Sequence, residues 1–145
     1  MENSSFIINI KSLEKSYGYG RSSVKVLKGI DLEVASGEVI SITGPSGTGK
    51  STLLNLIGCL DNFDNGVLKI SGMDVSSFEV DALSDFRNRH IGFIFQLHNL
   101  LLEFSAIENI MMPLLIRRMS VKEAREKSME LLKRFNLENR AHHKA

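Results

Sequence analysis

The first half of the chain carries short apolar runs of the kind that form β-strands. Residues 30–34 alternate between apolar and polar side chains, which predicts a half-buried strand. Further short runs, rich in β-branched and aromatic residues, predict more strands at 6–10, 24–27, 39–42, 67–70 and 92–95. Because the turn at 35–37 is short, we expect the strands at 30–34 and 39–42 to form a hairpin.

Helical patterns lie between these strands and dominate the end of the chain. Residues 51–60 are apolar nearly all round, which predicts a buried helix, and residues 80–89 form a charged helical pattern. Ser105 and Ser120 each open an S-x-x-E capping box, a start signal for a helix. Strands first, then a loop-helix unit, more strands and an all-helical end predict an α/β fold.

The strand at 39–42 and the helix at 51–60 flank a motif that fits G-x-x-x-x-G-K-[ST], the P-loop. Its glycines let the backbone curl around an anion, so that N–H groups and the start of the helix face the phosphates. Lys50 is placed to reach the β- and γ-phosphates, and the Ser51 hydroxyl can bind Mg²⁺. The pattern assigns to nucleotide binding Gly44, Pro45, Ser46, Gly47, Thr48, Gly49, Lys50, Ser51 and Thr52.

Composition narrows the class of protein. A chain of 145 residues is the size of one domain, and a net charge of +1 argues against a nucleic-acid binder, which usually carries a basic excess. A single cysteine, Cys59, excludes an internal disulfide and fits a reducing compartment. Residues 1–5 lack the basic start of a signal peptide, and the longest apolar run, 110–116, is too short to span a membrane. We therefore expect a cytoplasmic protein.

Beyond the P-loop, the chain resembles the ATP-binding subunit of ABC transporters over essentially its whole length. Residues 27–38 are similar to the stretch that leads to the P-loop in that family, and Phe95-Gln96 is similar to its Q-loop. Tyr17 matches the aromatic residue that stacks on adenine, with Tyr19 as a competitor. The resemblance implies that Gln96 contacts Mg²⁺ or the attacking water and serves catalysis. ATP and Mg²⁺ are the implied cofactors.

Two segments place the resemblance within the family. Residues 91–101 and 104–115 are similar to the lipoprotein-releasing ATPase and its relatives, the macrolide-export and cell-division ATPases, although Leu102 stands where that group often has proline. The resemblance implies a second ATP-binding subunit and an integral membrane permease as partners, with residues 97–115 facing the permease. It implies a peripheral position on the inner face of the cytoplasmic membrane, and no nucleic-acid partner.

Other parts of the family pattern do not occur in these 145 residues. No glycine follows Gly92, so the LSGGQ signature is not present, and no apolar run ends in an Asp-Glu pair, which would supply the Walker B aspartate and the catalytic glutamate. His142 and His143 lack the preceding strand expected of the H-loop. We therefore expect residues 1–145 to be a truncated, N-terminal part of the domain, marginally stable alone, that binds ATP weakly without appreciable hydrolysis.

Two other functions remain open from the sequence. One is a different P-loop enzyme, such as a nucleotide kinase or GTPase; the guanine-reading N-K-x-D motif does not occur, which disfavours a GTPase. The other is a non-catalytic fragment that binds ATP or docks on a permease without acting as a motor. The transported substrate and the direction of transport are left open by the sequence.

Overall fold

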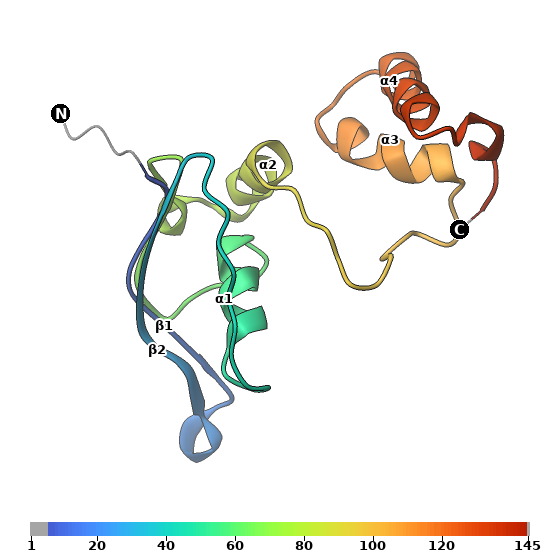
Figure 1. The fold of residues 1–145 in the computed structure, drawn as a ribbon. Helices are drawn as coiled ribbons and strands as arrows, with labels where there is room; N and C mark the ends of the chain where they lie inside the picture. The colour runs from blue at the N-terminus through green and yellow to red at the C-terminus, as the bar shows by residue number, and fades with distance from the viewer. Residues whose placement is uncertain (1–5, 145) are drawn as a thin grey trace. The chain divides into compact units, whose positions relative to one another are not determined.

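The computed structural model describes residues 6–144, without the side chain of Arg21, as two compact units that divide after Arg87. The first unit contains the P-loop, and the second contains the helical end of the chain (Figure 1). Residues 1–5, on which the prediction about a signal peptide depends, and Ala145 lie outside the described residues.

The first unit is built on a four-stranded antiparallel sheet in the order β2-β1-β3-β4. The bounds are β1 Phe6–Tyr17, β2 Val24–Ala35, β3 Asn65–Ile70 and β4 Met73–Asp74. Ile10 of β1 lies between Leu32 of β2 and Leu68 of β3, and Ile10 and Leu68 are fully buried. Alternate apolar residues of the strands thus form the core of this unit, as strand geometry requires.

Two of the predicted strands do not form. Residues 39–42 and 92–95 lie outside every strand of the described chain, with Val39 96% exposed and Ile94 fully exposed. The predicted hairpin between 30–34 and 39–42 is therefore wrong. Residues 24–35 instead form one continuous strand, β2, that pairs with β1. A strand needs a neighbour to pair its backbone hydrogen-bonding groups, and no strand among residues 6–144 pairs with either segment.

The first unit also contains two α-helices, α1 after β2 and α2 after β4 in the chain. Helix α1 spans Lys50–Ile57, beside β2, and ends before Cys59, whose positive φ of 54° turns the chain. Helix α2 spans Val80–His90, and Phe86 is its buried residue. Two short 3-10 helices complete the unit, η1 at Gly20–Ser22 and η2 at Val75–Ser77. The predicted helices at 51–60 and 80–89 are confirmed, the first with an earlier end.

The second unit is a pair of helices, α3 Ala106–Ile116 and α4 Val121–Arg134, followed by a 3-10 helix, η3 Glu138–Arg140. Its core lies between them and consists of Ile107, Met111, Ala124, Leu132 and Ala141. Both helices begin where the sequence predicts. The Ser105 amide donates to the Glu108 carboxylate at 2.8 Å, and the Glu123 amide donates to the Ser120 hydroxyl at 3.3 Å. Each cap thus pairs a backbone N–H group that the start of a helix would otherwise leave without an acceptor.

These caps predict an acid-sensitive second unit. Hydrogen bonds from Ser105 lower the pKa of Glu108, and those from Ser120 lower the pKa of Glu123. A carboxyl with a lowered folded pKa stabilises above its unfolded value, near 4.3, and loses that contribution as pH falls through the folded value. We expect circular dichroism to show loss of helix as the pH falls below about 4.3. The loss of helical signal with pH should be less steep in Glu108→Gln than in the wild type. Glu126→Gln, on α4, is the control and should behave like the wild type. Equal slopes would contradict the assignment.

Candidate functional site

The P-loop of the first unit curves because its glycines adopt backbone conformations that other residues disfavour. Gly47 and Gly49 have φ values of +81° and +94°, in the left-handed region. At Gly49 space is also short, since an added Cβ would lie 2.9 Å from Leu27 Cδ2 and 3.0 Å from Val26 Cγ1. Gly49 is the N-cap of α1, so the loop runs directly into a helix start. Backbone N–H groups at such a start favour anions.

Lys50 lies within the curve of this loop. Its Nζ donates to the carbonyl oxygen of Gly44 at 2.9 Å and to that of Pro45. The Thr48 hydroxyl donates to the same Pro45 carbonyl at 2.9 Å, which closes the turn. The ammonium group is therefore held at the mouth of the loop by the loop's own oxygens. In this position it can meet a phosphate that the loop amides bind.

Tyr17 and the P-loop line one open hollow of about 470 Å³. The lining residues are Tyr17, Val26, Ser46, Gly47, Gly49, Lys50, Ser51 and Thr52. The structure thus brings most of the sequence-assigned nucleotide residues together. The other three assigned residues, Gly44, Pro45 and Thr48, do not line the hollow. They shape the loop, because the Gly44 and Pro45 carbonyls accept from Lys50 and the Pro45 carbonyl also accepts from the Thr48 hydroxyl. Tyr19, the competing aromatic, is 95% exposed and is not among the lining residues.

Val26 is a lining residue that sequence reasoning did not single out. It lies in β2, next to Leu27, and its Cγ1 approaches Gly49 closely enough to exclude a Cβ there. It belongs to the strand predicted at 24–27, and nothing in the sequence indicated a place beside the P-loop. The end of β1 pairs with the start of β2, Tyr17 opposite Val24. Each of the two strands therefore contributes a residue to the hollow, Tyr17 from β1 and Val26 from β2.

The ring of Tyr17 is held by a cluster of charged side chains. Its hydroxyl donates to Asp61 Oδ2 at 2.7 Å, and Lys15 Nζ lies 2.9 Å from Asp61 Oδ1 and 4.9 Å from the ring centre. The hydrogen bond to Asp61 raises the pKa of the Tyr17 phenol, as does burial, whereas the Thr52 hydroxyl lowers it. Burial raises the pKa of Asp61, but hydrogen bonds from Tyr17, Lys15 and the Asn62 amide outweigh it and hold that pKa below its usual range.

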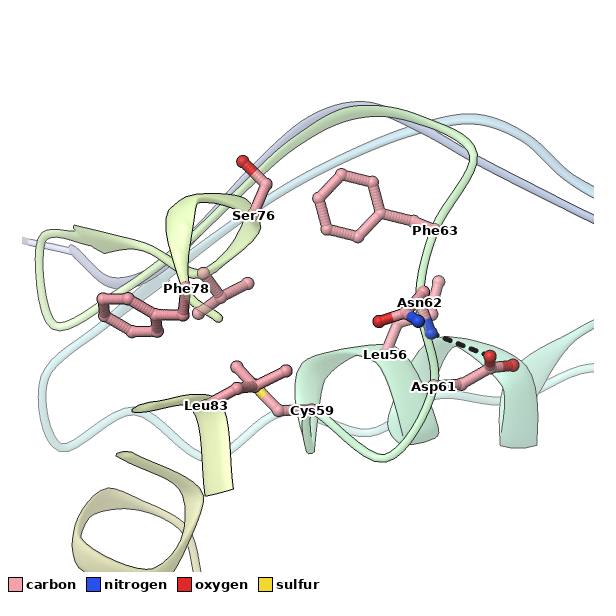
Figure 2. A pocket seen from close by; sticks show the side chains of 9 residues that line it. Leu56, Cys59, Asp61, Asn62, Phe63, Ser76, Phe78 and Leu83 are labelled. Carbon is pink, nitrogen blue, oxygen red and sulfur yellow. Dashed lines mark hydrogen bonds between the residues drawn. The ribbon is translucent and has the colours of Figure 1, made fainter. Parts of the chain in front are cut away.

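Asp61 also borders a second hollow of the first unit, of about 220 Å³ (Figure 2). Apolar side chains form most of its wall, among them Leu56, Phe63, Phe78 and Leu83. Cys59 lies in this wall, and burial raises the pKa of its thiol, which disfavours the reactive thiolate. Figure 2 shows the Asp61 carboxylate turned away from this hollow.

Gln96, the predicted catalytic and metal residue, belongs to the second unit. It is exposed, in a segment that is neither helix nor strand, after the stacked rings of Phe93 and Phe95, whose centres lie 5.2 Å apart. Ser51, the other predicted Mg²⁺ ligand, is exposed in the first turn of α1. Among residues 6–144, no group of three or more His, Cys, Asp or Glu side chains gathers in a way that could hold a metal. Ser51 supplies a hydroxyl oxygen, a donor type that suits Mg²⁺.

Comparisons with known proteins show the family to which the chain belongs. The family model described as ABC transporter matches residues 27–145. The lipoprotein-releasing system ATP-binding protein LolD of Bacteroides fragilis is 50% identical over 138 residues, which are 95% of this chain and 62% of LolD. LolD of Geobacter metallireducens is 48% identical over 140 residues, 97% of this chain and 62% of that protein.

Solved structures give the same fold. A dimeric, post-hydrolysis state of the ATP-binding cassette MJ0796, bound to ADP and Pi, is 39% identical with a TM-score of 0.82, over 94% of this chain and 61% of that one. A second dimeric structure of MJ0796, described as a bacterial ABC transporter cassette, is 40% identical with the same TM-score and coverage.

The fold and the P-loop site therefore define a nucleotide-binding cassette, and the chain belongs to the ABC transporter family. It spans about three fifths of the length of the curated relatives and solved cassettes that it matches. The resemblance stated from sequence and the predicted α/β fold are both confirmed, with β-strands that are antiparallel throughout residues 6–144. A nucleotide kinase or GTPase is not favoured by these matches. No helix among residues 6–144 combines the length and apolarity needed to cross a membrane.

Proposed function

We propose that this chain forms the nucleotide-binding part of an ABC transporter ATPase of the lipoprotein-releasing type. The observation that carries the proposal is the single hollow where Tyr17, Lys50 and Ser51 meet. One aromatic ring, one ammonium group and one hydroxyl beside a helix start match the base, the phosphates and the metal ion of Mg-ATP. The relatives named as lipoprotein-releasing support the subfamily.

Each group of the hollow takes a separate part of the nucleotide. The backbone amides from Gly47 to Thr52 and the start of α1 bind the phosphates, and Lys50 adds a positive charge at their outer end. The Tyr17 ring offers a face on which the base stacks. The Ser51 hydroxyl would hold Mg²⁺, which when bound neutralises charge on the β- and γ-phosphates. The chain's own residues thus bind and orient the triphosphate.

The proposed partners follow from the relatives. The solved MJ0796 cassettes are dimers, which supports pairing with a second ATP-binding subunit. Release of lipoproteins requires a membrane component, so we propose docking on an integral membrane permease at the inner face of the cytoplasmic membrane. Residues 97–115 are the proposed docking segment, and Leu97, Leu100 and Leu102 in it are exposed. The permease would determine the transported substrate.

Calorimetric titration of the purified 145-residue chain with Mg²⁺ tests the proposal, using ATP, inorganic tripolyphosphate and adenosine in separate runs. We expect ATP to bind most tightly, tripolyphosphate more weakly because it cannot stack on Tyr17, and adenosine below detection. Phosphate release, followed in the same samples, should stay at background, since these 145 residues hold no LSGGQ or Asp-Glu motif. Failure of both ATP and tripolyphosphate to bind would refute the proposed function.

A further inference from the structure

We propose that Asp61 is a positioning residue for the nucleotide base: it holds the Tyr17 ring in place, and Lys15 holds Asp61. The inference rests on the proposed function, because it concerns the same hollow. It adds a residue that lies outside the P-loop motif, 44 positions from Tyr17 in sequence, and that the sequence patterns did not single out. The contacts around Tyr17 carry the argument.

Tyr17 needs an external anchor. It is the last residue of β1, and Gly18 follows with a φ of +92°, so regular strand structure does not continue past the ring. Tyr17 as a residue is 42% exposed, so it is not enclosed in the packed core. A stacking platform works best when its ring is fixed before the base arrives, because ordering a side chain on binding costs affinity. The 2.7 Å hydrogen bond from the phenol to Asp61 supplies this restraint.

Asp61 is itself fixed by Lys15. The Lys15 side chain is buried, with the residue 8% exposed, and its Nζ donates to Asp61 Oδ1 at 2.9 Å and to the Asn62 carbonyl oxygen. The same ammonium lies over the Tyr17 ring, 4.9 Å from its centre, so one cation restrains both the carboxylate and the ring. The carboxylate is therefore set between two donors, one on each oxygen. A buried ammonium with two oxygen partners has little freedom to release Asp61.

The segment around Asp61 is also tied to β1 by two hydrogen bonds of Asp64, one to its carboxylate and one from its amide. The Ser16 amide donates to Asp64 Oδ2 at 2.7 Å, and the Asp64 amide donates to the Glu14 carbonyl at 2.9 Å. Residues 61–64 follow directly after the turn that ends α1, the helix that begins at Lys50. The helix that presents the phosphate-binding lysine thus continues into the segment that holds the base platform. Asp61 therefore connects the two halves of the hollow.

The test compares ATP and tripolyphosphate binding, because tripolyphosphate uses the phosphate cradle without a base. We expect Asp61→Ala to weaken Mg-ATP binding about tenfold, the size of one hydrogen bond to a charged group, and to leave tripolyphosphate binding within about twofold. Tyr17→Phe, which keeps the ring and removes the hydroxyl, should weaken ATP binding similarly. Adding Asp61→Ala to Tyr17→Phe should then have little further effect on ATP binding, since each change alone already removes the hydrogen bond between Tyr17 and Asp61.

Asp31→Ala is the matched control, because it also removes a carboxylate of the first unit that accepts a hydrogen bond from a β1 group, the Ser12 amide at 2.7 Å, and Asp31 does not line the hollow. It should leave both ligands within about twofold of the wild type. The inference is overturned if Asp61→Ala leaves ATP binding unchanged, if it weakens both ligands equally, if Asp31→Ala weakens ATP binding as much, or if the effects of the two changes in the double variant are additive. A wild-type chain that binds neither ligand would instead overturn the proposed function, and this inference with it.

A spectroscopic measurement checks the contact without any ligand. In a Tyr19→Phe background, Tyr17 is the remaining tyrosine, so tyrosinate absorbance reports its ionisation alone. Because the Asp61 carboxylate raises the pKa of Tyr17, Asp61→Asn should make the phenol ionise at lower pH. The same titration curve in both variants would show that the contact does not exist in solution and would overturn the inference, even if the chain binds ATP.

Discussion

Lys50→Ala is expected to reduce the affinity for Mg-ATP by at least about 100-fold and that for tripolyphosphate by a similar factor. The Lys50 ammonium is held at the mouth of the P-loop by carbonyl oxygens of the loop, where a bound triphosphate would replace those partners. Charge-assisted hydrogen bonds contribute about 1.5–3 kcal/mol each, and about 1.4 kcal/mol is a tenfold change in affinity. Calorimetry of both ligands measures the loss.

Lys28→Ala provides the control for charge. Lys28 is an exposed lysine of β2, in the same unit as Lys50 and outside the hollow. Its replacement by alanine should leave the affinities for Mg-ATP and tripolyphosphate within about twofold of the wild type. The Lys50 assignment is wrong if both lysine variants bind alike. A loss confined to ATP would also contradict it, because a lysine that binds phosphate must act on tripolyphosphate too.

Gly66→Ala is expected to destabilise the first unit by about 3 kcal/mol or more. Gly66 lies in β3 with a φ of +102°, and an added Cβ would lie 2.5 Å from the Ser12 carbonyl oxygen and 2.7 Å from Leu13 Cα. Both neighbours are backbone of β1, at a register shift in the β1–β3 pairing, so relief requires the two strands to separate. Denaturant unfolding followed by circular dichroism measures the change.

Gly29→Ala separates the two causes of this cost. Gly29 of β2 has a φ of +91°, close to that of Gly66, but an added Cβ would meet no atom within 4 Å. It should therefore cost only the backbone strain of a left-handed alanine, about 1–2 kcal/mol. Equal losses in the two variants would mean that strain, and not the close approach of β1, explains the role of Gly66.

Local patterns in the sequence predicted the local features of the structure. The glycines and lysine of the P-loop act within nine consecutive positions, and the two S-x-x-E boxes act within four, so neighbouring residues decide both features. The predictions of strands at 39–42 and 92–95 were wrong because a strand is stabilised by a partner strand, and that partner can lie anywhere in a chain. The residue types of these two segments indicate a preference for β-strand, but they do not indicate whether a partner strand is present.

The cluster at Asp61 was missed for a related reason. Asp61 and Tyr17 are 44 positions apart, and no spacing rule connects them. Their contact depends on the β1–β3 pairing and on the turn after α1, which together bring residues 61–64 against the end of β1. Asp61 follows an apolar helix in the sequence, and no pattern among its neighbours marks it as a functional residue.

The two ends of the P-loop are held unequally. Its C-terminal end is the first turn of α1, whereas residues 39–42, which lead into it, lie outside every strand in the described chain. Conformational freedom at that end must be given up when amides close around a triphosphate, and this entropy is subtracted from affinity. A neighbouring strand that pairs with residues 39–42 would order them beforehand. Such pairing would tighten nucleotide binding without contacting the nucleotide, and nucleotide binding would in turn favour the pairing.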